Sequence, residues 1–416
     1  MDKLLVRGGK PLAGTVRISG SKNAALPVMA ATLLTPGVHR LRNVPRLRDT
    51  RTFARVLELL GAKVAFDGNL LTIDTQGVNS VEAPYELVKT MRASIYVLGP
   101  LLARFGRAKV SLPGGCAWGP RPVNLHLTGL QAMGAQLEIE HGYIVGRDAK
   151  LKGATIGFDV VSVGATAQLM MAAVLAQGTT VLENAALEPD VTVLGEVLAG
   201  CGARIEGLGS RRLTIHGVSS LQPIDTTIIP DRIEAATFAA VAAMTGGTIK
   251  LENVIPDQFE AALRKLQESG CTLQRSADAV TVSGAARPRP VNVVTQPFPG
   301  FPTDMQAQMI AVCTIADGTS VVEDTIYTDR FTHVPELARM GARIELKGNV
   351  AVVRGVNRLA GAQVMATDLR ASACLVIAAL AAQGETLVDR IYHLDRGYES
   401  LEQKLAALGA DIRRIH

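Results

Sequence analysis

Polar and apolar positions along this chain follow a pattern that occurs six times. In each copy, a helical pattern with one apolar face ends in a glycine, and a strand pattern of alternating apolar residues follows. These marker glycines lie 68 to 73 residues apart: Gly61, Gly134, Gly202, Gly270, Gly341 and Gly409. Such regular spacing is typical of repeated structural units. The pattern therefore predicts six copies of one unit in the 416 residues.

A second helical pattern in each copy is apolar on nearly every side, as in residues 165–176 and 371–382. A helix without a polar face has to be buried. Together with a strand that starts at a glycine such as Gly178 or Gly318, each copy reads as βαβαββ. We therefore predict an α/β protein in which small residues let the apolar helices pack closely, with sheets and amphipathic helices outside them.

The length of the chain favours two domains with three copies each. The sixth copy stops at the end of the chain, where the other copies continue into another strand. Residues 5–14 (LVRGGKPLAG) match residues 352–361 (VVRGVNRLAG), so the N-terminus is expected to supply the missing strand. We predict an N-terminal domain of residues 21–229 and a C-terminal domain of residues 1–20 plus 230–416. The chain then crosses twice, and a hinged cleft between the domains is expected.

The net charge of +5 comes from basic residues scattered along the chain, which favours small anionic ligands over nucleic acid. The five cysteines lie far apart without C-x-x-C spacing, so neither disulfides nor a zinc site is expected. The N-terminus lacks the apolar stretch of a signal peptide, and the apolar runs are too short to span a membrane. We expect a soluble protein of the reducing cytoplasm, with no metal, no nucleic-acid partner and no membrane partner.

The second copy departs from the repeat. After the strand at Gly106 it continues as PGGCAWGPRPV in place of a short turn. The glycines around Cys116 permit unusual backbone shapes and the prolines restrict them, which is compatible with a lid. A thiol beside Arg121 would have a stabilised thiolate and could act as acid, base or nucleophile. An isolated cysteine is usually inert, but its place in the irregular copy favours a chemical role.

Polar residues stand at the start of each apolar helix. They are Ser21, Lys22, Asn23, Arg92, Ser162, Thr166, Asp231, Arg232, Glu234, Thr303, Asp304, Asp368 and Arg370. Ser21, Thr303 and Asp368 are equally well explained as N-caps. Capping does not explain the lysine or the arginines at positions 92 and 370, because cations oppose the dipole at a helix N-terminus. A bound anion would resolve that conflict.

Asp304 follows the rigid segment PFPGFPT at the start of an apolar helix. Its carboxylate is placed to accept a proton from a substrate hydroxyl, and an N-cap is the alternative. Arg330 and Arg396 occupy equivalent positions in copies five and six, and we expect both to bind an anion. The histidines, among them His126 and His333, show no metal-ligand spacing and are expected to be structural, as are the four cysteines outside the irregular loop.

These residues stand in motifs that closely resemble the enolpyruvyl transferase family, in particular the UDP-N-acetylglucosamine 1-carboxyvinyltransferases. The motifs are SGSKNAALP from Ser19, LPGGCAWGPRPV from Leu112, VSVGAT from Val161, PDRIEA from Pro230, PGFPTDMQAQ from Pro299, DRFTHVPELARMGA from Asp329, TDLRAS from Thr367 and YHLDRGYE from Tyr392. The resemblance covers the whole chain. It implies an inside-out α/β barrel fold, with two domains of three repeats around buried helices, which agrees with the glycine spacing.

The resemblance implies transfer of the enolpyruvyl group of phosphoenolpyruvate to the 3′-hydroxyl of UDP-N-acetylglucosamine, the first committed step of peptidoglycan synthesis. Phosphate is released through a tetrahedral intermediate, without a metal or other cofactor. The resemblance makes Cys116 the general acid and the thiol alkylated by fosfomycin, Asp304 the base, and Lys22 a further catalytic residue. It implies that phosphoenolpyruvate is bound by Lys22, Asn23, Arg92, Arg121, Arg330, Arg370 and Arg396. It implies that the nucleotide sugar contacts Asn23, Arg92, Arg121, Pro122, Val123, Asn124, Leu125, Ser162, Val163, Gly164, Asp304 and Ile326.

Two positions depart from the family pattern. Asn124 stands where aspartate is common, and Val160 where some members have lysine. We expect them to alter affinity for the nucleotide and not the type of reaction. Three alternatives stay open: the sister enzyme that acts on shikimate 3-phosphate but lacks the cysteine loop, a non-catalytic nucleotide-sugar sensor, and an RNA-end-processing enzyme of related fold.

Overall fold

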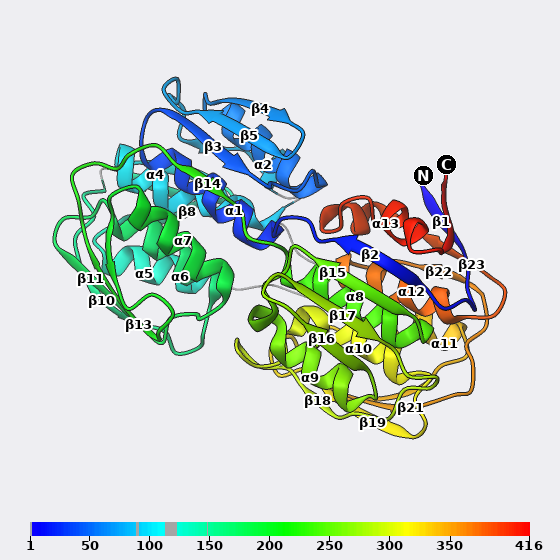
Figure 1. The fold of residues 1–416 in the computed structure, drawn as a ribbon. Helices are drawn as coiled ribbons and strands as arrows, with labels where there is room; N and C mark the ends of the chain where they lie inside the picture. Colours follow the sequence, from blue (N-terminus) through cyan, green and yellow to red (C-terminus); the bar gives the residue numbers. More distant parts are fainter. Residues whose placement is uncertain (1, 89–90, 113–122, 148) are drawn as a thin grey trace. The chain divides into compact units, whose positions relative to one another are not determined.

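The structure is a computed structural model that describes residues 2–88, 91–112, 123–147 and 149–416. The chain forms two compact units (Figure 1). Unit 1 consists of Met1–Ser19 and Pro230–His416, and unit 2 consists of Gly20–Ile229. The chain therefore leaves unit 1 once and returns to it once. Within the described ranges, no helix combines the length and the apolar character that a membrane span requires.

Each unit has three four-stranded sheets in its described residues. The sheets of unit 1 have the strand orders β22-β23-β1-β24, β16-β17-β15-β2 and β18-β19-β21-β20. The strands are β1 (Lys3–Arg7), β2 (Ala13–Arg17), β15 (Thr248–Glu252), β16 (Thr272–Arg275), β17 (Ala279–Ser283), β18 (Val293–Val294), β19 (Thr319–Glu323), β20 (Arg343–Lys347), β21 (Val350–Arg354), β22 (Gln363–Met365), β23 (Glu385–Asp389) and β24 (Asp411–Ile415).

The sheets of unit 2 have the orders β14-β3-β5-β4, β6-β7-β9-β8 and β10-β11-β13-β12. The strands are β3 (Val38–Arg42), β4 (Lys63–Asp67), β5 (Leu70–Asp74), β6 (Glu82–Ala83), β7 (Ala108–Ser111), β8 (Gln136–Glu140), β9 (Tyr143–Arg147), β10 (Thr155–Gly157), β11 (Thr179–Glu183), β12 (Arg204–Glu206), β13 (Arg212–His216) and β14 (Asp225–Thr227).

The helices alternate with these strands along the chain. Unit 2 contains α1 (Lys22–Ala31), η1 (Thr32–Leu34), α2 (Arg48–Leu59), α3 (Tyr85–Val88), η2 (Arg92–Val97), α4 (Leu98–Phe105), α5 (Asn124–Ala132), α6 (Val163–Ala173) and α7 (Pro189–Gly200). Unit 1 contains α8 (Arg232–Thr245), η3 (Pro256–Phe259), α9 (Glu260–Glu268), η4 (Thr303–Met305), α10 (Gln306–Cys313), α11 (Val334–Arg339), α12 (Leu369–Ala381), η5 (Ile391–Arg396) and α13 (Leu401–Ala407), where η denotes a 3₁₀ helix.

The third repeat shows the unit most directly, because β10, α6, β11, α7, β12 and β13 follow one another in the chain. Its sheet has one parallel pair, with Thr155 opposite Val181, and antiparallel pairing for the rest, with Thr179 opposite His216. The βαβαββ prediction and the six repeats are confirmed. The apolar helix of the second copy is not α-helical throughout, since it starts as the 3₁₀ helix η2 and becomes α-helical only in α4.

The two crossings of the chain exchange strands between repeats. β2 precedes α1 in the sequence, yet it pairs in parallel with β15 of unit 1, with Thr15 opposite Lys250. β14 precedes α8, yet it pairs in parallel with β3 of unit 2, with Thr226 opposite Leu41. In both cases, the chain crosses after the first strand of a repeat and before its apolar helix.

The N-terminal strand lies inside the last sheet. β1 runs antiparallel to both of its neighbours, with Leu5 opposite Leu387 of β23 and Arg413 of β24. It takes the position that β21 takes in the sheet of the fifth repeat. Asp2 accepts hydrogen bonds from Arg414 at 3.3 Å and from His416 at 2.9 Å, so the two ends of the chain lie together.

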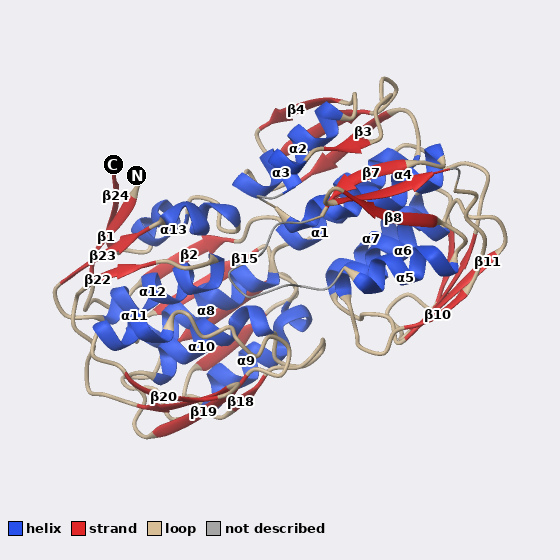
Figure 2. Cartoon of the chain, turned by 180° about the vertical axis from the view of Figure 1, so that it is seen from behind, coloured by secondary structure: helices blue, strands red, loops and turns tan. Residues whose placement is uncertain are grey.

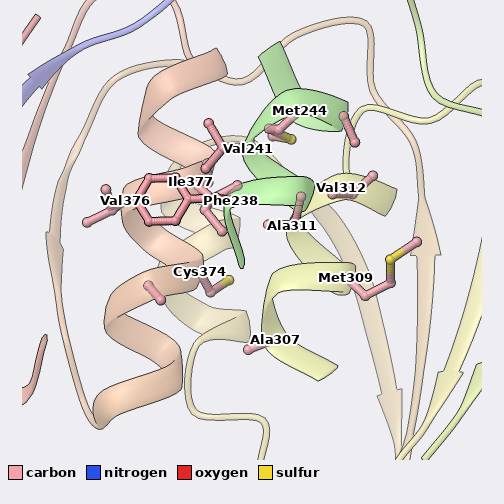
Figure 3. Packing of buried hydrophobic residues seen from close by; sticks show 14 of the residues in the cluster. Phe238, Val241, Met244, Ala307, Met309, Ala311, Val312, Cys374, Val376 and Ile377 are labelled. Carbon is pink, nitrogen blue, oxygen red and sulfur yellow. The ribbon is translucent and has the colours of Figure 1, made fainter. Parts of the chain in front are cut away.

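The apolar helices form the centre of each unit. In unit 1, α8, α10 and α12 contact one another, and Figure 3 shows Phe238, Ala311 and Ile377 in their shared cluster. The sheets lie toward the outside of these helices (Figure 2). In unit 2, a Cβ added to Gly99 of α4 would lie 2.8 Å from the main-chain oxygen of Gln168 in α6. Small residues therefore set how closely these helices approach.

Ser19, the last residue of unit 1 before the first crossing, is held by a buried ion pair. Its N–H donates to Oε2 of Glu234 at 2.9 Å, and its hydroxyl accepts from Nζ of Lys404 at 2.7 Å. Lys404 also donates to Oε1 of Glu234 at 2.5 Å, and the Glu234 side chain is 2% exposed. Burial raises the pKa of Glu234 although Lys404 opposes the shift. The charge of Glu234 therefore depends on this lysine for compensation.

We expect Lys404→Met to lower the free energy of unfolding by about 3–5 kcal/mol, because it leaves the Glu234 carboxylate buried without its cation. Adding Glu234→Gln to Lys404→Met should restore part of this loss, since the unpaired charge is then absent. Urea unfolding followed by circular dichroism measures both variants. Equal stability of Lys404→Met and the unaltered protein would contradict the claim that Lys404 compensates the buried charge of Glu234.

Candidate active site

Asp304 lies between two buried arginines. It occupies η4, directly before α10, and its Oδ1 accepts from Nη1 of Arg330 at 2.7 Å. Its Oδ2 accepts from Nη2 of Arg370 at 2.6 Å. The arginine side chains are 8% and 4% exposed, whereas the aspartate side chain is 26% exposed. One carboxylate that remains accessible is thus held by two guanidinium groups with little exposure of their own.

The two arginines decide the ionisation of Asp304. Burial alone would raise the pKa of this carboxyl group, but Arg370 and Arg330 outweigh burial and hold the pKa well below its usual range. The carboxylate is therefore ionised at neutral pH. In this arrangement the carboxylate is also a weak proton acceptor. Its pKa would have to rise for it to act as a catalytic base.

Asp324 connects the turn that carries Asp304 with the loop that carries Arg330. Its buried carboxylate accepts from the hydroxyl of Thr303 at 2.7 Å and from the hydroxyl of Thr295 at 2.8 Å. It also accepts from the N–H of Ile326 at 3.0 Å, within the loop that leads to Arg330. Sequence reasoning missed Asp324, although copies one, three and four of the repeat have asparagine at this position and copy five has aspartate.

The expectations for helix capping are confirmed at two positions and wrong at a third. The hydroxyl of Ser21 accepts from the N–H of Ala24 at the start of α1, and Asp368 accepts from the N–H groups of Arg370 and Ala371 at the start of α12. Thr303 does not cap a helix. Its hydroxyl bonds to Asp324 and accepts from Arg330 at 3.1 Å, because it lies inside η4 and not before it.

Cations at two helix N-termini have partners within their own unit. Nη2 of Arg370 bonds to Asp304, and Nζ of Lys22 lies 3.3 Å from Oδ2 of Asp49 in α2. Both carboxylates offset the unfavourable position of a cation beside a helix dipole. Aspartates of the chain therefore compensate the positive charges that suggested a bound anion at these two residues. An anion would have to compete with these aspartates.

In unit 2, the N-terminal ends of α5 and α6 lie close together. Ser162 caps α6, and a Cβ added to Gly164 would lie 3.1 Å from Nε2 of His126 in α5. Asn124, the first residue of α5, is exposed, while Val123 and Leu125 beside it are partly exposed. The structure thus brings together two of the segments that the resemblance assigns to the nucleotide.

Other candidate residues are placed by the structure one by one. Asn23 follows Lys22 in α1 and is partly exposed, Ile326 is 36% exposed on the loop after β19, and Arg396 ends η5 and is partly exposed. Cys116, Arg121, Pro122 and the side chain of Arg92 lie outside the described residues.

His333 and four cysteines among the described residues are buried. Burial, together with the nearby Arg330, lowers the pKa of His333 to about 3, so its ring is neutral. Cys201, Cys271, Cys313 and Cys374 are buried free thiols. Burial raises the pKa of Cys313 to about 11. Among the described residues, no group of three or more His, Cys, Asp or Glu side chains could hold a metal ion.

The described residues combine six four-stranded sheets and buried apolar helices with a carboxylate that two arginines hold. The family model of EPSP synthase (3-phosphoshikimate 1-carboxyvinyltransferase) matches residues 6–405, and the chain belongs to this family of enolpyruvyl transferases.

Curated relatives identify a branch of the family. The UDP-N-acetylglucosamine 1-carboxyvinyltransferase of Geobacter metallireducens is 57% identical over 415 residues, which cover 100% of both chains. The protein of the same name from Chlorobium limicola is 54% identical over 417 residues, covering 100% of this chain and 98% of its own.

Two solved structures have the same fold. The enolpyruvyl transferase NikO from Streptomyces tendae superimposes with a TM-score of 0.90 at 28% identity, over 99% of this chain and 98% of its own. An EPSP synthase from Acinetobacter baumannii has a TM-score of 0.79 at 16% identity over 100% of both chains, a likeness that extends to the fold alone.

We expect Asp304→Asn to lower the free energy of unfolding by about 3 kcal/mol at pH 7, because two buried guanidinium groups lose their counter-charge. The lowered pKa of Asp304 means that its ion pairs contribute at neutral pH and are lost as the pH falls below about 4. The difference in free energy of unfolding between Asp304→Asn and the unaltered protein should therefore become smaller at acidic pH. Urea unfolding at several pH values measures this, and equal stability at pH 7 would contradict it.

Proposed function

We propose that this protein transfers the enolpyruvyl group of phosphoenolpyruvate to the 3′-hydroxyl of UDP-N-acetylglucosamine and releases phosphate. The observation that carries this proposal is 57% identity, over the full length, to a protein named for that activity. The Asp304 site supports it, because transfer to a hydroxyl needs a base and the donor substrate needs cations. The reaction is the first committed step of peptidoglycan synthesis.

The reaction proceeds by addition and elimination. The hydroxyl oxygen forms a bond to C2 of phosphoenolpyruvate as its proton passes to Asp304, and an acid adds a proton to C3. The tetrahedral intermediate then loses a proton from C3, the double bond re-forms, and the bond from C2 to the phosphate oxygen breaks. Phosphate leaves with the electron pair of that bond. No electron acceptor or donor is required.

The ion pairs of Asp304 make its activity as a base depend on the substrate. Phosphoenolpyruvate carries about three negative charges, which attract Arg330 and Arg370. When these guanidinium groups also bond to the substrate, they stabilise the carboxylate less, and the pKa of Asp304 rises from its lowered value. Asp304 then accepts the hydroxyl proton only when the donor substrate is bound, which limits unproductive proton transfer.

Cys116 is the proposed acid that adds the proton to C3. The same thiol is the proposed site of alkylation by fosfomycin. We assign binding of phosphoenolpyruvate to Lys22, Asn23, Arg92, Arg121, Arg330, Arg370 and Arg396. We assign binding of the nucleotide sugar to Asn23, Arg92, Arg121, Pro122, Val123, Asn124, Leu125, Ser162, Val163, Gly164, Asp304 and Ile326. We also place the protein in the cytoplasm, where both substrates are expected.

The assay that tests the function is release of phosphate from phosphoenolpyruvate. We expect release only when UDP-N-acetylglucosamine is present, and loss of activity after incubation with fosfomycin. The family model is named for transfer to shikimate 3-phosphate, so this compound is the matched control. Release with shikimate 3-phosphate and not with the nucleotide sugar would overturn the proposal, and binding of the nucleotide sugar without turnover would favour a sensor.

We expect Cys116→Ala to abolish phosphate release while leaving affinity for UDP-N-acetylglucosamine within about threefold, since the thiol is proposed to donate a proton and not to hold the nucleotide. Isothermal titration calorimetry measures the affinity. Cys201→Ala is the matched control. Cys201 is buried and has no proposed role in catalysis, so this variant should retain turnover. Normal turnover of Cys116→Ala would exclude the proposed role.

A further inference from the structure

Tyr398 is a buried tyrosine that contacts three apolar helices of unit 1 through its hydroxyl group. The residue is 2% exposed. Its Oη accepts from Nη1 of Arg370 in α12 at 3.2 Å and from Nε2 of Gln308 in α10 at 3.2 Å. It lies 3.0 Å from Oγ1 of Thr237 in α8. One hydroxyl thus joins the helices that carry the Asp304 site.

The direction of each hydrogen bond follows from the partners. Arg370 can only donate to Oη, and the Gln308 amide also donates, because its Nε2 faces the main-chain oxygen of Asp304 at 3.0 Å. Because the hydroxyl of Thr237 donates to another acceptor, the hydroxyl of Tyr398 donates its proton to Thr237. The hydroxyl of Thr237 in turn donates to the main-chain oxygen of Ile233 at 2.7 Å. Nε2 of Gln308 also lies 3.2 Å from Oγ1 of Thr237, so its two N–H groups are shared among Asp304, Tyr398 and Thr237.

This network holds both halves of the Asp304 ion pair. Arg370 is fixed at Nη2 by Asp304 and at Nη1 by Tyr398. Gln308 connects Tyr398 with the main chain of Asp304 itself. If the carboxylate takes up a proton, the bond to Nη2 weakens, but the bond from Nη1 to Tyr398 remains. The guanidinium group then keeps its orientation through the reaction.

We propose that Tyr398 is a positioning residue that sets the orientation of Arg370 toward Asp304 and so controls the strength of this carboxylate as a base. This inference rests on the proposed role of Asp304. The effect acts through Arg370, because a preorganised guanidinium group costs no reorganisation when charge moves in the reaction. Tyr398 also donates its N–H to the main-chain oxygen of Leu394 at 3.1 Å, within the turn that ends at Arg396.

Few other charges act on the Tyr398 hydroxyl. Arg370 from α12 and Asp231 from the start of α8 are the charged groups that influence it, while Thr237 and Gln308 are neutral. Burial raises the pKa of Tyr398 although Arg370 opposes the shift, so the hydroxyl keeps its proton at neutral pH. A pH effect of changing Tyr398 therefore reports on Asp304 and not on the tyrosine.

The test compares Tyr398→Phe with Tyr143→Phe. The hydroxyl of Tyr143 also accepts one N–H, from Tyr85 at 3.2 Å, and no role in catalysis or binding is assigned to this residue of unit 2. We expect Tyr398→Phe to lower kcat by about 10- to 100-fold with KM values within about threefold, as misalignment of a charged group does. The acid limb of its kcat–pH profile should move to higher pH, because a less aligned Arg370 lowers the pKa of Asp304 less. Tyr143→Phe should match the unaltered protein in both.

A second measurement tests the path through Arg370. In an Arg370→Lys background, which removes the planar donor pair, Tyr398→Phe should cause little additional loss of kcat. A full additional loss would overturn the proposal, as would a lower thermal midpoint of Tyr398→Phe with kcat and the pH profile unchanged. Turnover by Asp304→Asn separates the proposed base from the proposed positioning residue. If this turnover is lost while Tyr398→Phe is fully active, only the positioning role of Tyr398 fails. If Asp304→Asn is fully active, the proposed base fails and this inference fails with it.

Discussion

The central constraint on this molecule is that its middle helices have no polar face. α8, α10 and α12 are buried along nearly their whole length, so each must be surrounded by other apolar surface, and the sheets and amphipathic helices of unit 1 provide it. Polar chemistry is then confined to the ends of these helices. Asp304 and Arg370 stand at such ends, and the side chains of Thr237 and Gln308 lie within one or two turns of them. The demand for burial therefore concentrates the polar groups of the unit into one small region.

Charge compensation within that region is local, because one carboxylate bonds to two guanidinium groups of the same unit. Arg330 and Arg370 bond to the same carboxylate, Asp324 fixes the turn and the loop that bear two of these three residues, and Tyr398 fixes the third. In the proposed reaction, an anionic substrate shares these guanidinium groups with Asp304. Binding and activation of the base are then one event, because the same guanidinium groups take part in both.

The repeat and the caps at Ser21 and Asp368 could be predicted from sequence because they depend on spacing and on neighbours within a few residues. The partners of Lys22 and Arg370 could not be, since Asp49 and Asp304 come from other elements of the fold. Thr303 had the residue type of a cap, but the tertiary contact with Asp324 determined its role. Tyr398 stands in the motif YHLDRGYE but had no predicted role, because its proposed function depends on three helices that meet only in the folded unit.

The exchange of strands at the two crossings has a consequence for the order in which the chain folds during synthesis. Unit 2 is one continuous segment, so it can fold as soon as Ile229 has left the ribosome. β1 and β2 are made first, but their partners β23, β24 and β15 are made much later. β1 must therefore wait with unpaired edges until β23 and β24 are made, whereas β2 can pair once β15 has been made. Because the two ends of the chain lie together at Asp2 and His416, joining them and opening the chain at Ser19 would make each unit continuous and remove that delay.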